Sequence, residues 1–406
     1  MNRFWRSPAL RAGIVYGISG AGFAGANVLL ARALPTVEYG ILSLAIALLN
    51  FSIMLAPAGA DGVVIRRLIA PSLGLLARVV ITSTVLGACV VAIAYLIYDL
   101  PTRLLVFLLL GILAGGVTAL AGAQFRSQQR FRVSLALTQS PNMILAFVAG
   151  LALAVEIEDA LAILVVLTLG LFAAGTLGWG RLFAEKWPES GSGGPLPWAE
   201  ALSYVGVSAA FGVLVQAERF VIPKALTVHD LATFGVLAAT VGAPFRMLQL
   251  GVNYTLFPRL RASTTTSETR HLLQQEALVV WSAVMLASIL VWYVAPAFVD
   301  WFLAGKYSLS PPLVAAAIIA GTIKVLDGFS QAIVTAFGNT RQLAQYNLLG
   351  WPAVVVGILA SVIGARWGLV GVVAGAGLGW LARSLAGTYV VSPTFRKKMY
   401  GARPHE

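Results

Sequence analysis

The sequence predicts an all-α polytopic membrane protein with about twelve transmembrane helices, and two observations carry that prediction. Apolar runs of about 20 residues, long enough to cross a hydrocarbon core of ~30 Å, follow one another along nearly the whole chain. Lysine and arginine residues fall mainly on alternate connections between these runs. We place the twelve runs at 12–32, 40–62, 78–98, 102–124, 133–155, 160–182, 198–222, 230–256, 273–296, 311–337, 342–364 and 367–390.

The distribution of basic residues predicts that both termini are cytoplasmic. Of 28 lysines and arginines, 20 fall on the side that includes the two termini and 5 on the other, while Arg219, Arg246 and Lys324 lie inside predicted helices. Connections rich in lysine and arginine stay in the cytoplasm. Eleven or thirteen helices would break the alternation, so the charges support an even count of twelve. We expect a multi-pass protein of the bacterial inner membrane.

Composition argues against several classes of site. The formal net charge of +12 is spread over short connections without the clustered stripe that binds nucleic acid, so we expect no nucleic-acid partner. Cys89 is the only cysteine, and the three histidines lie outside the helix centres. We therefore expect no disulfide, no metal site and no cofactor.

A Pro-, Gly- and Ser-rich stretch at 184–197 divides the predicted helices into six and six. We expect an N-terminal lobe over 1–183, a cytoplasmic linker over 184–197, a C-terminal lobe over 198–390 and a basic tail over 391–406. Local similarities between the halves, such as Tyr39-Gly40 with Phe234-Gly235, suggest a duplication. Because six is even, the halves are expected to be related by a pseudo-two-fold axis along the membrane normal, with a binding site between them.

Charged residues inside predicted helices mark candidate site positions, because each costs at least ~2.5–3.5 kcal/mol near the bilayer centre. Lys324 and Asp327 share one helical face, and they either neutralise each other or face a cavity. Arg246 follows Pro244, where we expect a kink, and its partner is expected to be Asp327 or an anionic substrate. Glu218 and Arg219 lie near the outer end of their helix, where extension to the membrane interface is an equal alternative.

The N-terminal half contributes uncharged polar residues instead. The candidates for contact with a polar substrate are Asn27, Asn50, Gln139 and Asn142. Amides bind sugars, and in lipid they also bond neighbouring helices. For any one of these residues the second role is the more common, so they stay candidates as a group.

Several short strings then suggest a family. They are Leu29 to Leu34 with Pro35, Glu38, Tyr39 and Gly40; Glu218 to Ile222; Phe234-Gly235 with Phe257-Pro258; Phe302 to Tyr307; and Ala336 to Arg341. Together these strings resemble the signatures of Wzx-type polysaccharide flippases in the MOP superfamily, which also includes MATE exporters and the lipid II flippase MurJ. The resemblance covers almost the whole chain with diffuse motifs, and Glu218 stands where aspartate is commoner.

The resemblance implies a MATE-like pair of six-helix lobes that alternate access. It further implies a transporter, not an enzyme, which moves an undecaprenyl-pyrophosphate-linked oligosaccharide to the outer leaflet for a surface polysaccharide such as O-antigen or exopolysaccharide. Arg246, Lys324 and Arg219 would bind pyrophosphate, since arginine can contact two oxygens at once. Asp327 and Glu218 would form charge pairs or couple transport to H⁺ or Na⁺, which stays open. Membrane lipids, a polysaccharide polymerase and glycosyltransferases are the expected partners.

Two other functions compete with this interpretation. A MATE-type small-molecule antiporter would have the same fold but favours acids and aromatics for organic cations, whereas the internal charge here is net positive. A membrane glycosyltransferase or polymerase would need paired carboxylates or a metal in a sizeable aqueous loop, and the acids of the predicted outer loops are isolated or lie in one short cluster at 156–159. A scaffold without transport gives no reason for Arg246 and Lys324 to lie in the membrane.

Overall fold

The structure is a computed structural model that describes residues 8–185, 197–263 and 265–400 of the 406. Within these ranges every regular element is a helix. Most of the expected linker (186–196) and the end of the expected tail (401–406) lie outside the described residues. The elements are α1 (Pro8–Ala33), α2 (Thr36–Leu55), α3 (Ala60–Arg67), α4 (Leu73–Tyr98), α5 (Thr102–Ser127), α6 (Phe131–Val155), α7 (Ala160–Ala184), α8 (Trp198–Ala225), α9 (Val228–Leu237), η2 (Ala238–Gly242), α10 (Ala243–Ala262), α11 (Thr266–Phe302), α12 (Pro311–Phe337), α13 (Thr340–Gly364), η3 (Ala365–Trp367) and α14 (Gly368–Tyr400).

The helices account for all twelve predicted runs. Among the described residues, ten helical stretches are long and apolar enough to cross a membrane. One of these, Arg341–Pro393, contains both α13 and α14, which meet at the short turn η3. Counting α13 and α14 separately, and adding the 26-residue helix α1, gives one helical stretch for each run. The chain is thus an all-α, multi-pass membrane protein, as its hydropathy predicted.

The helices form two compact units, which we describe separately. The N-unit is Ile18–Gly235, and the C-unit combines Val236–Glu406 with Met1–Gly17. Helix α8 and most of α9 therefore pack within the N-unit, although they follow the linker in sequence. The division into six and six helices at 184–197 stays a prediction. Helix α14 continues to Tyr400, through the first residues of the expected tail.

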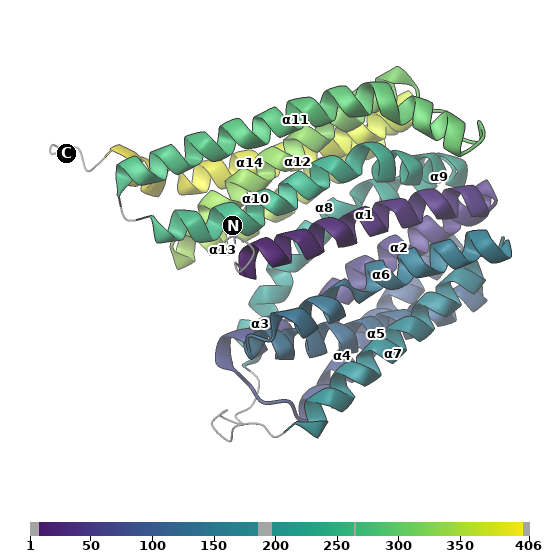
Figure 1. Ribbon diagram of the computed structural model, residues 1–406, viewed down its shortest axis with the longest axis horizontal. Coiled ribbons are helices and arrows are strands. Elements are labelled where there is room, and N and C mark those ends of the chain that lie inside the picture. The colour runs from purple at the N-terminus through teal and green to yellow at the C-terminus, as the bar shows by residue number, and fades with distance from the viewer. Residues whose placement is uncertain (1–7, 186–196, 264, 401–406) are drawn as a thin grey trace, which may run out of the picture. The chain divides into compact units, whose positions relative to one another are not determined.

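The N-unit is organised around α5, which packs against α2, α3, α4, α6 and α7 (Figure 1). Its small residues let these neighbours approach closely, as is common between helices in membranes. A Cβ atom added to Gly115 would lie 2.3 Å from Ile53 of α2, and one added to Gly116 would lie 2.3 Å from the Ser83 hydroxyl of α4. The Gly-rich sequence of α5 thus makes it the centre of this unit.

Helix α8 joins the N-unit at the break between α2 and α3. The chain turns there at Gly59, whose φ of +76° suits glycine. A Cβ atom on Gly59 would lie 1.9 Å from the Ala201 carbonyl oxygen of α8, and one on Gly62 would lie 2.9 Å from the Tyr204 ring. Glu200 forms ion pairs with Arg66 at 3.2 Å and Arg67 at 2.7 Å. Close backbone contact and charge together hold the start of α8 to α3.

In the C-unit, α12 packs against α10 and α14, and α13 packs along α14 (Figure 1). Helices α13 and α14 form an antiparallel hairpin of small residues. A Cβ atom on Gly375 would lie 2.4 Å from the Ala360 carbonyl carbon, and one on Gly364 would lie 2.2 Å from the Gly371 carbonyl oxygen. Their backbones are therefore in direct contact, which is why one uninterrupted apolar stretch folds back as two helices.

A π-helical turn, η2, lies between α9 and α10. It ends two residues before Pro244, where the sequence predicted a kink. The proline ring clashes with the carbonyl group four residues earlier, at Thr240. Because Thr240 lies inside η2, the wider π turn accommodates that clash. The irregularity expected near Pro244 is thus a π-helical turn.

Candidate functional site

Two polar rows face each other along α10 and α12 of the C-unit. Arg246, Gln249 and Asn253 repeat at intervals of three and four residues on α10, as do Lys324, Asp327 and Gln331 on α12. This spacing places each row on one helical face. The Asn253 amide donates a hydrogen bond of 3.1 Å to Gln331, and a Cβ atom on Gly328 would lie 3.1 Å from the Gln249 carbonyl oxygen. The two helices are therefore parallel and in register.

Asp327 forms a buried ion pair with Arg383 of α14. Arg383 Nη1 donates to Asp327 Oδ2 at 2.8 Å, and the two side chains are 6% and 0% exposed. Tyr346 of α13 lies against Arg383, with 5.2 Å between its ring centroid and the guanidinium carbon. Sequence reasoning counted Arg383 among the cytoplasmic cations, and the structure corrects this. Its position inside the predicted run 367–390 was the signal that could have revealed it.

Three cations, one each on α10, α12 and α14, outnumber the one carboxylate beside them. Lys324 is half-buried, with its Nζ 5.7 Å from the ring centroid of Trp380, and Arg383 lies 5.9 Å from the same ring. Arg246 has an exposed side chain. With Asp327 included, this part of the C-unit carries a net formal charge of +2, which suits an anionic ligand. We call Arg246, Lys324, Asp327 and Arg383 the charge cluster.

Two of the four predicted polar residues of the N-terminal half lie together. Ser19 of α1 donates a hydrogen bond of 2.6 Å to Gln139 of α6, and Asn142 donates one of 3.0 Å to Ser19. Gln139 and Asn142 thus bridge two helices, the role that amides commonly have in lipid. Asn27 is buried and donates to the Phe23 carbonyl of its own helix at 2.8 Å, and Asn50 is half-buried on α2. The four residues do not form one cluster.

Glu218 and Arg219 lie inside the N-unit. Their side chains are 2% and 8% exposed, so the alternative in which they extend to the membrane interface does not match their burial. Arg219 donates to Gln216 at 3.2 Å, and its guanidinium carbon lies 5.4 Å from the ring centroid of Phe234. Arg219 and the three cations of the charge cluster belong to different units.

Three of the strings that suggested a family are neighbours in this structure. A Cβ atom on Gly235 would lie 2.7 Å from the Tyr39 hydroxyl, and one on Gly40 would lie 2.5 Å from the Val228 carbonyl oxygen. With Arg219 over Phe234, the strings near 39, 219 and 234 join α2, α8 and α9. These residue types are therefore required for close packing.

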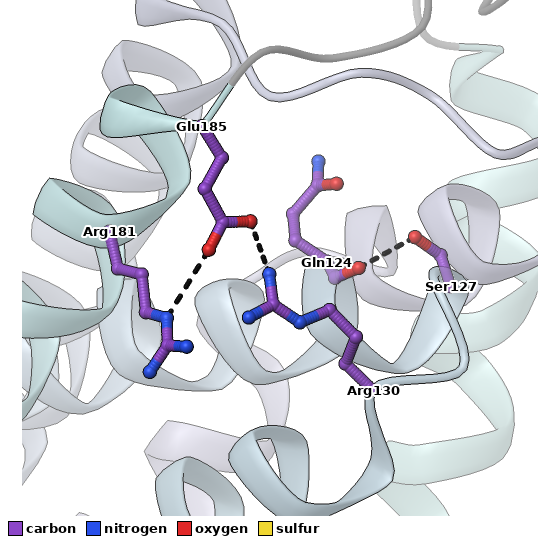
Figure 2. A network of polar contacts seen from close by, with 5 residues as sticks. All are labelled: Gln124, Ser127, Arg130, Arg181 and Glu185. Atoms are coloured by element: carbon purple, nitrogen blue, oxygen red, sulfur yellow. Dashed lines mark hydrogen bonds and ion pairs between the residues drawn. The ribbon is translucent and has the colours of Figure 1, made fainter.

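A polar network lies where α5, α6 and α7 meet at one end of the N-unit (Figure 2). Glu185 accepts from Arg181 at 3.3 Å and forms an ion pair with Arg130. Arg130 also lies 5.1 Å from the ring centroid of Phe125. The hydrogen bond from Arg130 holds the pKa of the Glu185 carboxyl below its ordinary value. Glu185, the last described residue before 186–196, is thus fastened to the N-unit.

We expect Glu185→Gln to lower the melting temperature at neutral pH and to have no effect in acid. A carboxyl whose pKa is lowered by folding stabilises the protein above its ordinary pKa, about 4.3, and this contribution is lost as the pH falls through the lowered value. Melting curves of the native protein and the variant, measured in detergent between pH 7 and pH 3.5, should draw closer as the pH falls below the ordinary value of about 4.3. The exposed Glu158, changed to Gln, is the control. A constant difference across the range would contradict the prediction.

No family model matches the sequence, and no match was found among curated proteins. Solved structures do match. The lipid II flippase MurJ in an inward closed conformation superposes with a TM-score of 0.70 at 10% identity, over 96% of this chain and 90% of MurJ. An inward-facing MATE family multidrug resistance transporter of the MOP superfamily gives 0.67 at 10% identity, over 95% and 96%. The chain has the fold of these transporters.

A shared fold at 10% identity identifies neither a substrate nor a mechanism, so both depend on the residues of the site. Among the described residues, no three His, Cys, Asp or Glu side chains form a group that could hold a metal ion. The structure instead gathers cations and amides on α10, α12, α13 and α14. Sequence reasoning identified Arg246, Lys324 and Asp327 there, but missed Arg383, Gln249 and Tyr346, because polar residues become informative only once their helices are known to be neighbours.

Proposed function

We propose that the protein is a flippase that moves an undecaprenyl-pyrophosphate-linked oligosaccharide from the cytoplasmic to the outer leaflet of a bacterial inner membrane by alternating access. The observation that carries this proposal is the charge cluster, in which Arg246, Lys324 and Arg383 outnumber Asp327 inside a helical membrane unit. Cations in a membrane are costly unless they serve a pathway or a ligand. A pyrophosphate, with about two negative charges, matches the net +2.

The fold and the residues support different parts of the proposal. A fold shared with a lipid II flippase and a MATE transporter supports transport by two units. Of the polar side chains Asn27, Asn50, Gln139 and Asn142, the half-buried Asn50 and Asn142 have the most surface left for a glycan. The bias of basic residues supports cytoplasmic termini. A polymerase and glycosyltransferases of one surface-polysaccharide pathway are the natural partners of such a flippase.

The charge cluster favours the membrane potential as the driving force. A proton bound to Asp327 would raise the net charge of the cluster and strengthen anion binding, so the proton and the anion would travel outward together. Export against the proton gradient would then cost energy. The potential alone contributes about 2.3 kcal/mol per charge per 100 mV, or roughly 4–5 kcal/mol for two charges. We therefore assign Asp327 to charge pairing, and we propose the same role for Glu218 because it interacts electrostatically with the neighbouring Arg219.

The test is translocation of a fluorescent polyprenyl-pyrophosphate oligosaccharide in proteoliposomes with an imposed potential. We expect Arg246→Ala and Lys324→Ala each to slow flipping by about ten- to a hundredfold, since a hydrogen bond to a charged group contributes about 1.5–3 kcal/mol. Lys224→Ala is the matched control, because Lys224 is half exposed and pairs with Asp99 at 3.6 Å near the end of α8. Native protein that moves no lipid but exports an organic cation would overturn the proposal in favour of an antiporter.

A further inference from the structure

The carboxylate of Asp327 lies at a junction of four helices in the C-unit. Its Oδ2 accepts from Arg383 of α14, and the side chains of Gln249 of α10 and Tyr346 of α13 lie beside it. All four residues are more than nine-tenths buried. A buried carboxylate must be paired with a cation, bind a metal ion or take up a proton. Here the cation is Arg383, which is covalently part of α14.

The second carboxylate oxygen of Asp327, Oδ1, is not hydrogen-bonded in the way that Oδ2 is. Asp327 Oδ1, Tyr346 Oη and Gln249 Nε2 are all buried, and none makes a hydrogen bond of normal geometry to a described residue. The Tyr346 hydroxyl and the Gln249 amide group therefore lie beside a carboxylate of which only Oδ2 is engaged by arginine. Oxygen ligands of this kind suit hard cations. The junction has the chemistry of a small-cation site, with a guanidinium group in the position of the ion.

We infer that Arg383 occupies the place at Asp327 that a free small cation, Na⁺ or H⁺, would otherwise take. The native C-unit is therefore indifferent to Na⁺, and removing the guanidinium group creates a cation-binding site. This property of the junction is independent of the proposed substrate. The counter-ion of Asp327 is built into the chain and cannot be exchanged, so this carboxylate does not carry a coupling ion.

Other titratable groups on the surrounding elements are few. Within four residues of Gln249, Asp327, Tyr346 and Arg383 along their own helices, the other titratable groups are Arg246 on α10 and Lys324 on α12, while Glu276 of α11 pairs with Arg259 at 2.6 Å. None of the groups beside Asp327 is a second carboxylate. Loss of Arg383 thus leaves one buried negative charge at the junction, which a single monovalent cation neutralises.

The test compares melting temperatures of the full chain in detergent, as native protein and as Arg383→Gln. Each is measured at pH 8.5 in NaCl and in choline chloride of equal concentration. We expect no difference for the native protein and a rise of about 2–4 °C in NaCl for the variant, the size expected when a weakly bound ligand stabilises only the folded state. A variant that responds to a fall in pH but not to NaCl identifies the proton as the cation. No response to either overturns the inference.

Two further variants show whether the response belongs to Asp327. Lys324→Gln removes a cation that lies over the same Trp380 ring, and it should leave the protein indifferent to Na⁺. Asp327→Asn combined with Arg383→Gln should abolish the response of the single variant. A native protein that is stabilised by NaCl, with the effect lost in Asp327→Asn, would overturn the inference directly.

If Arg383→Gln does not withstand solubilisation, the same comparison is made on recovery. The amount of monodisperse protein is measured after extraction in NaCl, in choline chloride and at pH 6. Recovery restored by Na⁺ or by the lower pH supports the inference, and recovery in none of the three overturns it. Failure of this test and failure of flipping are distinguishable, because no substrate is present.

Discussion

Asp327→Leu is expected to destabilise the protein by about 3–5 kcal/mol, one of the two largest losses that we anticipate from a single substitution. The change removes the partner of Arg383, whose side chain is 6% exposed and cannot reach water without disturbing α14. An uncompensated buried charge is the main cost, and the lost hydrogen bond of 2.8 Å adds to it. Denaturant titration in mixed micelles measures the free energy of unfolding.

The matched control removes both charges. Asp327→Leu combined with Arg383→Met should recover most of the lost stability, because replacing a buried ion pair with apolar side chains of similar volume is often neutral. If the single variant is as stable as the native protein, the guanidinium group has another sufficient partner and the ion pair is not what holds it. The single variant Arg383→Met is measured as well. If the double variant is less stable than both Asp327→Leu and Arg383→Met, packing contributes more than charge to the stability of the junction.

Gly59→Ala is expected to cost about 2–5 kcal/mol, from two separate causes. The φ of +76° is unfavourable for alanine, and the added Cβ atom would lie 1.9 Å from the Ala201 carbonyl oxygen. Gly59 lies in the tight turn between α2 and α3, and Ala201 lies in α8, so relieving the clash requires moving this turn and α8 apart. The free energy of unfolding, measured as above, gives the total.

Two other glycines separate the causes. Gly368, with φ +66° and ψ −155°, has no atom within 4 Å of an added Cβ atom, so Gly368→Ala should show a conformational cost without a clash, about 1–3 kcal/mol in a region that only glycine commonly adopts. Gly25 lies inside α1 with open space at the same position, so Gly25→Ala should cost nothing or stabilise the helix slightly. Gly59 is in the left-handed helical region, so a Gly59→Ala loss no greater than about 1–2 kcal/mol would show that α8 is not held rigidly at Ala201.

Hydropathy predicted the helices well because the apolar requirement of a membrane acts on each helix separately. All twelve runs coincide with helical stretches, and even the kink expected near Pro244 is present as η2. What hydropathy could not predict is which helices are neighbours. The break at Gly59, which lets α3 contact α8, depends on a backbone approach of two segments more than a hundred residues apart.

The charge cluster also shows that sequence patterns do not reveal which residues of different helices are neighbours. Arg246, Lys324 and Asp327 stood out because a charge in an apolar run is costly whatever surrounds it. Arg383 was assigned to the cytoplasm because the charge-counting rule treats an arginine near the end of a run as belonging to the adjacent connection. Its ion pair with Asp327 exists only because α12 and α14 pack in parallel, a fact that no local pattern contains.

The contacts of α8 also bear on how the protein is made. The N-unit, Ile18–Gly235, is one continuous segment, so all its packing partners are synthesised before residue 236 is added. Glu200 can find Arg66 and Arg67, and Ala201 can close on Gly59, while the C-unit helices from α11 onward are still unsynthesised. The residues of α1 up to Gly17 group with the C-unit, so this part of α1 finds its packing partners only after the chain beyond residue 235 has been made.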